Sequence, residues 1–360
     1  MTEPEQVVPG RLRDWLARAV EMEASDLHVV AGYPPVLRVH GELRQLDCVA
    51  IARDAVPALL VPLCPPHAMD RFQAERNADF ALELALPDKL QRLRANYFMS
   101  GQQMGACFRL IPSRIPDFQW AGFPEGLAQQ LTHFRNGLVL IAGVVGSGKT
   151  TSLAMLIQLL NQEGGYRIIT VEEPVEYVFP RMSNSLVTQR EVGLDVHTFA
   201  DGLKYALRQD PDVILVGEIR DRQTAQMALS AAETGHLVFS TLHTRDAKGA
   251  ISRYADLFPQ SDQNEVRAQL ALSLRAVVSQ HLLPNLRPGE RRVLAMEILL
   301  NNSAIASSVR TGRIEGIDNI LLTCRAEGML TLDEAVKRLL RDGSISMETA
   351  LRFVSQGTRL

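Results

Sequence analysis

Four short apolar runs in the middle of the chain are each followed by a polar or glycine-containing turn. They cover residues 138–142, 168–171, 213–216 and 237–241 and are rich in valine, isoleucine and leucine. Continuous runs of this length are typical of strands buried on both faces, as in a parallel sheet with crossover helices. Because the segments between the runs have helical spacing, the pattern predicts an α/β domain.

The N-terminal part of the chain follows a different pattern. Residues 11–22 place apolar side chains at helical spacing, and short alternating runs of polar and apolar residues follow as far as Ile111. Alternation with a period of two is typical of strands with one buried face, so we predict a small α+β domain over residues 1–112. Prolines then cluster, and we predict an interdomain linker over residues 113–118 and a second domain over residues 119–360.

Beyond about residue 260 the strand pattern is lost. Residues 265–283 and 331–343 instead place apolar side chains at helical spacing. This period predicts amphipathic helices that bury one face. The second domain is therefore expected to end in a helical C-terminal subdomain.

Length and composition narrow the class of protein. With 360 residues, 46% hydrophobic and 22% charged, the chain fits an ordinary globular protein of two domains. Its longest apolar stretch is far shorter than the ~20 residues of a membrane-spanning helix. A net charge of −3 argues against sequence-independent nucleic-acid binding. The N-terminus has no apolar signal region and the four cysteines are scattered, so we expect a cytoplasmic protein without a zinc or disulfide framework.

The most specific signal is a complete G-x-x-x-x-G-K-[ST] pattern between a predicted strand and a predicted helix. Its glycines let backbone N–H groups surround phosphates, and the following helix adds the positive end of its dipole. Lys149 is expected to reach the terminal phosphates, and Thr150 to offer its hydroxyl to Mg²⁺. The candidate nucleotide-binding residues of this loop are Gly143, Gly146, Ser147, Gly148, Lys149, Thr150 and Thr151.

Carboxylates follow two of the predicted strands. Glu172, Glu173 and Glu176 crowd the end of one strand, and Glu218 follows another. An acid at the end of a strand beside a phosphate-binding loop can approach the magnesium ion, and a carboxylate near the nucleotide can orient and deprotonate the attacking water. A solvated acidic loop is the alternative interpretation of the first group.

Two histidines, His236 and His243, flank the last of the apolar runs. A single histidine is more often a bystander than a catalytic group. Two of them beside a strand parallel to the phosphate-loop strand favour the prediction that one faces the terminal phosphate. Both are candidate site residues.

These segments resemble the secretion ATPase superfamily of type II secretion and type IV pili, and most closely its pilus retraction ATPases of the PilT/PilU type. The resemblance rests on GVVGSGKTTSL, VEEPVEYV, VTQREVGLD, ALRQDPDVILVGEIRD and AAETGHLVFSTLHT, in the family's order. It implies a PAS-like N-terminal domain joined to a RecA-like P-loop ATPase domain. It also implies a homohexamer that binds ATP and Mg²⁺ at the interface between subunits.

The resemblance also implies roles for single residues. Glu176 matches the family's general base for water, and His243 matches a sensor of the γ-phosphate. Glu218 matches a residue that helps to position magnesium and water. Arg94 and Arg109 match N-terminal arginines that complete the site. Arginine is well suited to stabilise charge on a transferring phosphoryl group.

The function implied is an ATP-hydrolysing bacterial motor for type IV pilus retraction and twitching motility, located in the cytoplasm at the inner membrane beneath the pilus. Its expected partner is an inner-membrane pilus platform protein, and a paralogous pilus ATPase is a further candidate. The alternatives are a pilus assembly or type II secretion ATPase, and a low-turnover accessory nucleotide-binding partner of another motor. Three departures from the family pattern are Glu173 in place of aspartate, Gln102 in place of arginine, and a less charged segment at residues 304–310.

Overall fold

The computed structural model describes residues 9–86, 89–111, 114–287, 289–355 and 358. The chain divides into two compact units, Met1–Arg114 and Ile115–Leu360, and each is described by itself. No helix among the described residues is long and apolar enough to cross a membrane.

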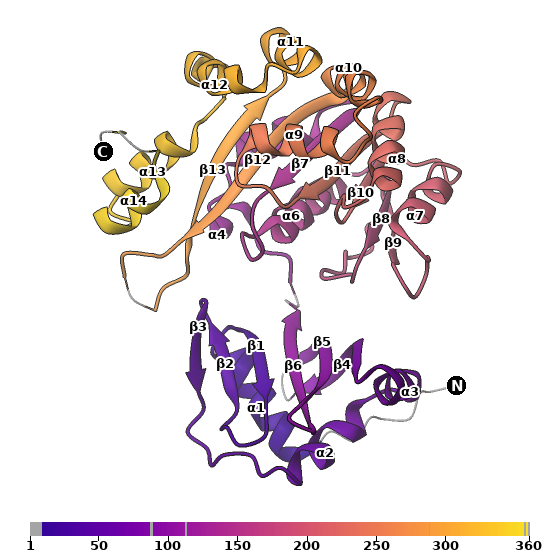
Figure 1. The fold of residues 1–360 in the computed structure, drawn as a ribbon, viewed down its shortest axis with the longest axis vertical. Helices are drawn as coiled ribbons and strands as arrows, with labels where there is room; N and C mark the ends of the chain where they lie inside the picture. The colour runs from indigo at the N-terminus through magenta and orange to yellow at the C-terminus, as the bar shows by residue number, and fades with distance from the viewer. Residues whose placement is uncertain (1–8, 87–88, 112–113, 288, 356–357, 359–360) are drawn as a thin grey trace. The chain divides into compact units, whose positions relative to one another are not determined.

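The first unit is a six-stranded sheet with its helices packed on one face (Figure 1). The strands are β1 (Ala24–Val29), β2 (Val36–Val39), β3 (Glu42–Gln45), β4 (Asn77–Leu86), β5 (Lys89–Ser100) and β6 (Gln103–Ile111), in the antiparallel order β3-β2-β1-β6-β5-β4. The helices are α1 (Gly10–Glu21), α2 (Ala55–Leu60), η1 (Val61–Leu63) and α3 (Pro66–Glu75). Side chains alternate along β5 between buried and partly exposed, because only one face is covered by the helices. The predicted helix and alternating strands are confirmed.

The second unit is built on a seven-stranded sheet of order β13-β12-β7-β11-β10-β8-β9. Its strands are β7 (Gly137–Ala142), β8 (Arg167–Glu172), β9 (Leu186–Glu191), β10 (Val213–Val216), β11 (Leu237–Leu242), β12 (Leu274–Leu283) and β13 (Val293–Leu300). All neighbouring pairs are parallel except β12 with β13. The four predicted strands are confirmed as β7, β8, β10 and β11, and each is fully or almost fully buried.

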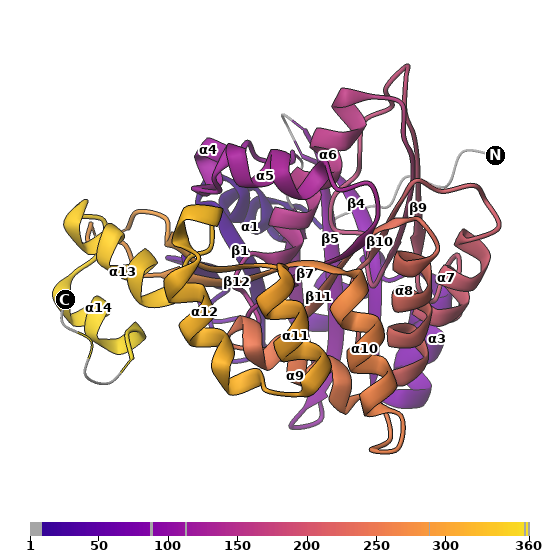
Figure 2. The same cartoon turned by 90° about the horizontal axis from the view of Figure 1, so that it is seen from above.

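Helices cover both faces of this sheet. On one side lie α4 (Phe118–Ala121), α5 (Glu125–Thr132) and α6 (Lys149–Glu163); on the other lie α8 (Arg222–Glu233), α9 (Ala247–Asp256), α10 (Gln263–Ser273) and α11 (Ser303–Thr311) (Figure 2). Near the edge strand β9, α7 (Phe199–Ala206) packs against α8. The core is one large apolar cluster that includes the sheet interior.

The end of the chain corrects one prediction. Residues 265–283 do not form one helix: α10 ends at Ser273, and β12 begins at Leu274. Residues 276–279 are almost wholly buried between β7 and β13, and pairing on both sides overrides the helical spacing of an apolar run. Strand β13 lies in the same region and was not predicted either. The remainder is helical, with α12 (Ile317–Thr323), α13 (Leu332–Arg341) and α14 (Met347–Phe353), and three-residue turns η2 (Ile314–Gly316) and η3 (Arg325–Glu327).

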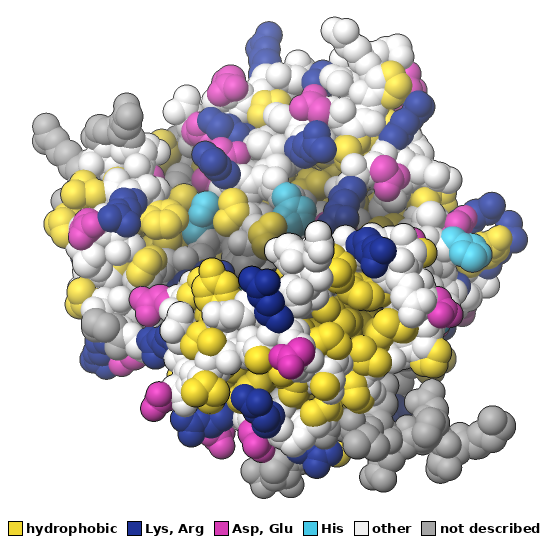
Figure 3. Space-filling view, turned by 60° about the horizontal axis from the view of Figure 1, so that its bottom comes forward, with side chains coloured by type: hydrophobic (Ala, Val, Ile, Leu, Met, Phe, Trp, Pro, Cys, Tyr) yellow, Lys and Arg dark blue, Asp and Glu magenta, His cyan; other side chains and the backbone are white. Residues whose placement is uncertain are grey.

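The surface carries both signs of charge. On the face displayed in Figure 3, Lys and Arg side chains are interspersed with Asp and Glu.

Candidate functional site

Glycines shape the loop that joins β7 to α6. Gly143, Gly146 and Gly148 have φ values of 148°, 75° and 90°, a region that residues with a Cβ rarely adopt. A Cβ on Gly143 would clash with the Ser147 side chain and lie 2.7 Å from the carbonyl oxygen of Gln280. Position 143 therefore requires glycine for space as well as for conformation.

The start of α6 offers hydrogen-bond donors that the protein leaves unused. Ser147 is 2% exposed, and its Oγ has no hydrogen-bond partner among the described residues. The first backbone N–H groups of a helix also lack partners within the helix. A buried hydroxyl beside such N–H groups favours an anionic ligand that accepts hydrogen bonds from both.

Lys149, the first residue of α6, folds back over the loop. Its Nζ donates to the carbonyl oxygens of Gly143 at 2.9 Å and Val144 at 3.1 Å. Burial lowers the pKa of Lys149, and the negative charges of Glu218 and Glu176 act in the opposite direction. An ammonium held by neutral carbonyl groups can bind the negative charge of a phosphate.

A chain of contacts leads from this lysine across the neighbouring strands. Lys149 Nζ lies 3.4 Å from His243 Nδ1, and His243 Nε2 lies 3.2 Å from Oε2 of Glu218. The same carboxylate oxygen pairs with Arg220 Nε at 2.7 Å, and Arg220 Nη1 lies 3.9 Å from Glu173. These side chains follow β11, β10 and β8, whose carboxyl ends share one edge of the parallel sheet, the usual place for a ligand in such a sheet.

Glu172, the last residue of β8, is buried beside this edge, with 6% of its surface exposed. Its Oε1 accepts hydrogen bonds from Thr170 Oγ1 at 2.6 Å and from Gln189 Nε2 at 3.2 Å. Burial raises the pKa of Glu172 to about 7, although these two hydrogen bonds and one from the backbone of Glu176 act in the other direction. These contacts make Glu172 a positioning residue, which orients Thr170 and Gln189.

Strand β9 holds the acidic loop that follows β8. Gln189 Nε2 donates to the carbonyl oxygen of Tyr177 at 2.7 Å, and Glu191 Oε2 accepts the N–H of Val175 at 3.0 Å. The Tyr177 hydroxyl lies 2.9 Å from Thr151 Oγ1 on α6. The half-buried Glu176 between Val175 and Tyr177 is thereby held near enough to Lys149 to affect its pKa.

Comparisons with known proteins identify the family of the chain. The model of the type II/IV secretion system protein family matches residues 2–357. The chain belongs to this family.

Three relatives of this secretion-family chain are informative. The "Twitching motility protein" of Neisseria gonorrhoeae is 39% identical over 323 residues, which are 90% of this chain and 85% of the relative. The "Type IV pilus retractation ATPase PilT" of Pseudomonas aeruginosa is 38% identical over 339 residues, 94% and 96% of the two chains. The crystal structure of the pilus retraction motor PilT with bound ADP matches at a TM-score of 0.84 and 37% identity, covering 96% of this chain and 97% of that one. The predicted fold class is confirmed by this match.

The structure does not bring His236 to the phosphate-binding loop. His236 precedes β11, and its carbonyl oxygen accepts the N–H of Gly137 at the start of β7. The loop follows the other end of β7, roughly 16 Å away along a strand of this length. The prediction that His236 contacts the nucleotide is therefore corrected for this subunit's own loop: of the two flanking histidines, only His243 lies at the carboxyl end of the strand.

Arg94 and Arg109 lie in the first unit, where they are direct cross-strand neighbours on β5 and β6. Arg109 Nε bonds Asp26 Oδ1 at 3.1 Å, and Arg94 Nε lies 3.7 Å from Asp79. Side chains directly opposite each other on paired strands share one face of the sheet. The sequence prediction thus named two residues that the fold brings together on the partly exposed face.

Sequence reasoning missed the supporting residues of the site. Arg220 pairs with both Glu218 and Glu173, and Gln280 joins β12 to α6 through Ser152 Oγ at 2.7 Å. For Arg220 a signal exists, because it lies two positions after Glu218 at a strand end. For Gln280 the sequence carries no such signal, because the order of strands in the sheet cannot be read from local spacing.

Proposed function

We propose that this chain is an ATPase that works as a homohexameric ring and powers the retraction of type IV pili, and thereby twitching motility. The observation that carries the proposal is the contact chain Lys149–His243–Glu218 beside a glycine-shaped loop. It is supported by near full-length similarity to a PilT whose structure contains ADP.

ATP is the substrate that the loop fits. The N–H groups of residues 144–146 and 148, the Ser147 hydroxyl and the Lys149 ammonium supply donors and positive charge for its phosphates. The N–H groups of Gly143 and Ser147 donate instead to the carbonyl oxygens of Leu242 and Val144. Thr150 and Thr151 follow in the first turn of α6. The Thr150 hydroxyl and, through water, Glu218 would hold Mg²⁺, which offsets the negative charge of the phosphates when bound.

Hydrolysis needs a water molecule that is oriented and deprotonated, and a residue that responds to the terminal phosphate. We assign the first role to Glu176 as general base, with Glu218 orienting the same water. His243 lies between Lys149 and Glu218, so it is placed to respond when a γ-phosphate draws the lysine away from the loop carbonyls. Positioning and electrostatic stabilisation account for this chemistry without a covalent intermediate.

The N-terminal unit would contribute from within the ring. Arg94 and Arg109 share one face of its sheet, and we propose that they add positive charge to a nucleotide bound at a subunit interface. Motion of these units would be passed to an inner-membrane platform protein of the pilus. In this proposal the ring lies in the cytoplasm beneath the membrane.

Substituting His243 tests its proposed role. We expect His243→Asn to lower kcat by about 10- to 100-fold with little change in KM for ATP, because the side chain acts on the reacting phosphate more than on ground-state binding. Steady-state ATPase kinetics measure both constants. A raised KM with an unchanged kcat would show that His243 only binds nucleotide.

The cellular role is tested by complementing a deletion strain with the wild-type gene, Lys149→Ala, or Lys204→Ala as an exposed control on α7. Surface pili are counted and twitching zones measured. A retraction motor gives cells with excess pili that do not twitch in the Lys149→Ala strain. Cells without pili would instead favour an assembly or secretion motor, and normal pili and twitching would favour the accessory role.

A further inference from the structure

The acidic loop that follows β8 carries Glu176 in a segment without regular secondary structure. Buried and more exposed side chains alternate along residues 175–179, and Glu176 is one of the more exposed ones. This alternation is typical of an extended backbone. Within the part of the chain that the structure describes, no backbone–backbone hydrogen bond holds these residues. Because buried backbone groups need partners, side chains from other elements must fix the conformation of the loop.

Gln189, on β9, supplies most of these partners. Its Nε2 donates to the carbonyl oxygen of Tyr177 at 2.7 Å, and its Oε1 accepts the N–H of Phe179 at 3.0 Å. Since the carbonyl group needs a donor and the N–H an acceptor, these two partners also fix the orientation of the amide. Nε2 donates in addition to Oε1 of Glu172 at 3.2 Å. One side chain therefore makes three hydrogen bonds, two of them to the backbone that follows Glu176.

The backbone is also held on the other side of the proposed general base. The carboxyl group of Glu172 accepts the N–H of Glu176 itself, and Oε2 of Glu191 accepts the N–H of Val175 at 3.0 Å. Glu172 is in turn held by Gln189. Gln189 therefore acts directly on one side of Glu176 and through Glu172 on the other.

Tyr177 connects the acidic loop to the helix that follows the phosphate-binding loop. Its side chain is buried in the apolar cluster of the second unit, and its hydroxyl lies 2.9 Å from Thr151 Oγ1 on α6. Glu176, the preceding residue, is near enough to Lys149 to affect its pKa. Because Gln189 binds the carbonyl group of Tyr177, the loop is fixed to β9 as well as to α6.

We propose that Gln189 is a positioning residue, which sets the place of Glu176 relative to the bound nucleotide. It acts by holding the backbone of the acidic loop at the residues that flank Glu176. The inference rests on the role of Glu176 as general base under the proposed function. A displacement of about 1 Å in a reacting group can cost roughly 100-fold in rate, so loss of Gln189 affects the chemical step and leaves nucleotide binding unchanged.

Steady-state ATPase kinetics of the assembled full-length protein provide the test. Gln189→Met keeps the length of the side chain and removes its three hydrogen bonds. Gln189→Glu keeps the shape of the side chain and an acceptor for the N–H of Phe179, but as a carboxylate it turns an oxygen toward the carbonyl group of Tyr177. The second variant keeps the test valid if the first one fails to fold.

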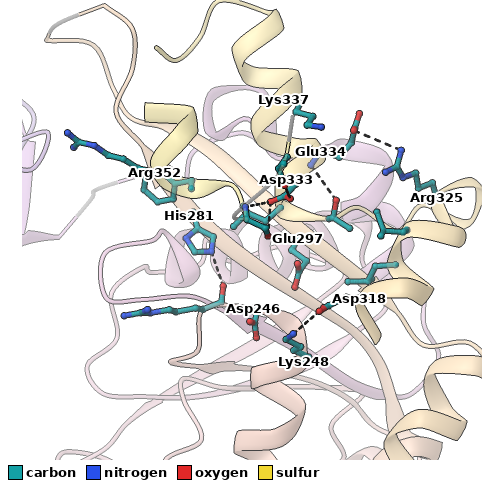
Figure 4. A pocket seen from close by; sticks show the side chains of 18 of the residues that line it. Asp246, Lys248, His281, Glu297, Asp318, Arg325, Asp333, Glu334, Lys337 and Arg352 are labelled. Atoms are coloured by element: carbon teal, nitrogen blue, oxygen red, sulfur yellow. Dashed lines mark hydrogen bonds and ion pairs between the residues drawn. The ribbon is translucent and has the colours of Figure 1, made fainter. Parts of the chain in front are cut away.

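Two controls remove polar contacts that do not reach the acidic loop. Thr188→Val, on the same strand, removes a hydrogen bond from Arg167 Nη1 at 2.9 Å. Asp318→Ala removes an ion pair with Lys248 at 2.7 Å, in the pocket that α9 and α12 help to line (Figure 4). Both controls report what a general loss of stability does to the rate.

We expect Gln189→Met and Gln189→Glu to lower kcat by roughly tenfold or more and to change KM for ATP by less than about threefold. Both controls keep the wild-type constants. An unchanged kcat in the two Gln189 variants overturns the inference, whether or not KM rises. So does an equal fall in kcat in Thr188→Val, because the effect would then belong to the strand and not to the contact with the loop.

A double-mutant cycle separates this inference from the role of Glu176. Glu176→Gln removes the proposed base, and single-turnover hydrolysis measures its slow rate. Adding Gln189→Met to Glu176→Gln should then cost less than about twofold, because no base remains to be positioned. The full loss seen in the wild-type background would overturn the positioning role alone. Unimpaired hydrolysis by Glu176→Gln would overturn the general base of the proposed function, and this inference with it.

Discussion

The fold raises the pKa of the Glu172 carboxyl group to near neutral pH. Its Oε1 accepts hydrogen bonds from Thr170 and Gln189, the backbone of Glu176 donates a further one, and burial raises its pKa to about 7. Its conjugate acid therefore persists at a pH where an exposed glutamate is fully ionised. Such a group links the stability of the sheet edge to pH.

Glu172→Gln tests this link. Between the ordinary glutamate pKa and about 7, the folded state binds the proton of Glu172 more tightly than the unfolded state does, so its contribution to stability falls as the pH rises through that interval. Glutamine imitates the protonated acid at every pH. We expect the variant to gain, relative to the wild type, on the order of 2–3 kcal/mol in free energy of unfolding between pH 5 and pH 8.

Urea unfolding at several pH values measures the difference, and Glu163→Gln at the exposed end of α6 serves as control. Parallel stability curves for the wild type and Glu172→Gln would contradict the raised pKa.

At the scale of elements, one carboxylate joins two helices from different parts of the chain. Glu297 on β13 accepts the N–H of Ala247, the first residue of α9, at 2.8 Å, and the backbone N–H of Leu332, the first residue of α13. Both groups lack partners within their helices. Glu297 therefore fixes the segment after His243 to the C-terminal helices.

Replacing this side chain should weaken the second unit. Glu297→Ala leaves two helix N–H groups without an acceptor, and we expect a loss of about 2–4 kcal/mol in the free energy of unfolding. Glu290→Ala removes only an exposed ion pair with Arg287 and should cost less than about 1 kcal/mol. Equal losses for the two variants, measured by urea unfolding, would contradict the bridging role.

Sequence patterns succeeded for elements whose signal is local. The runs that became β7, β8, β10 and β11 are short, apolar and followed by turn residues, which together favour buried strands, and the glycine pattern before Lys149 specified the loop. For β12, the residues have helical spacing, and pairing with β7 and β13 decides their conformation. For His236, the residue type suggested a contact with the nucleotide. The residue lies at the start of β11, however, and the direction of that strand puts it at the end of the sheet opposite the phosphate-binding loop.

At the scale of the whole molecule, the sequence indicated two domains with the phosphate-binding loop in the second, and the structure has two units with that loop in the second. The candidate site was predictable where a motif carried it, as for Lys149, Glu218 and His243. Its supporting contacts from Arg220, Gln189 and Gln280 were not, because they depend on which strands become neighbours.

The central claim is that the loop ending in Lys149 binds ATP for hydrolysis. Its most direct test is the steady-state ATPase rate of the purified chain beside Lys149→Ala and the surface control Lys204→Ala. We predict that Lys149→Ala lowers turnover at least about 100-fold, since it removes the cation that faces the terminal phosphates, and that the control keeps the wild-type rate. Undiminished ATP hydrolysis by Lys149→Ala would contradict the account.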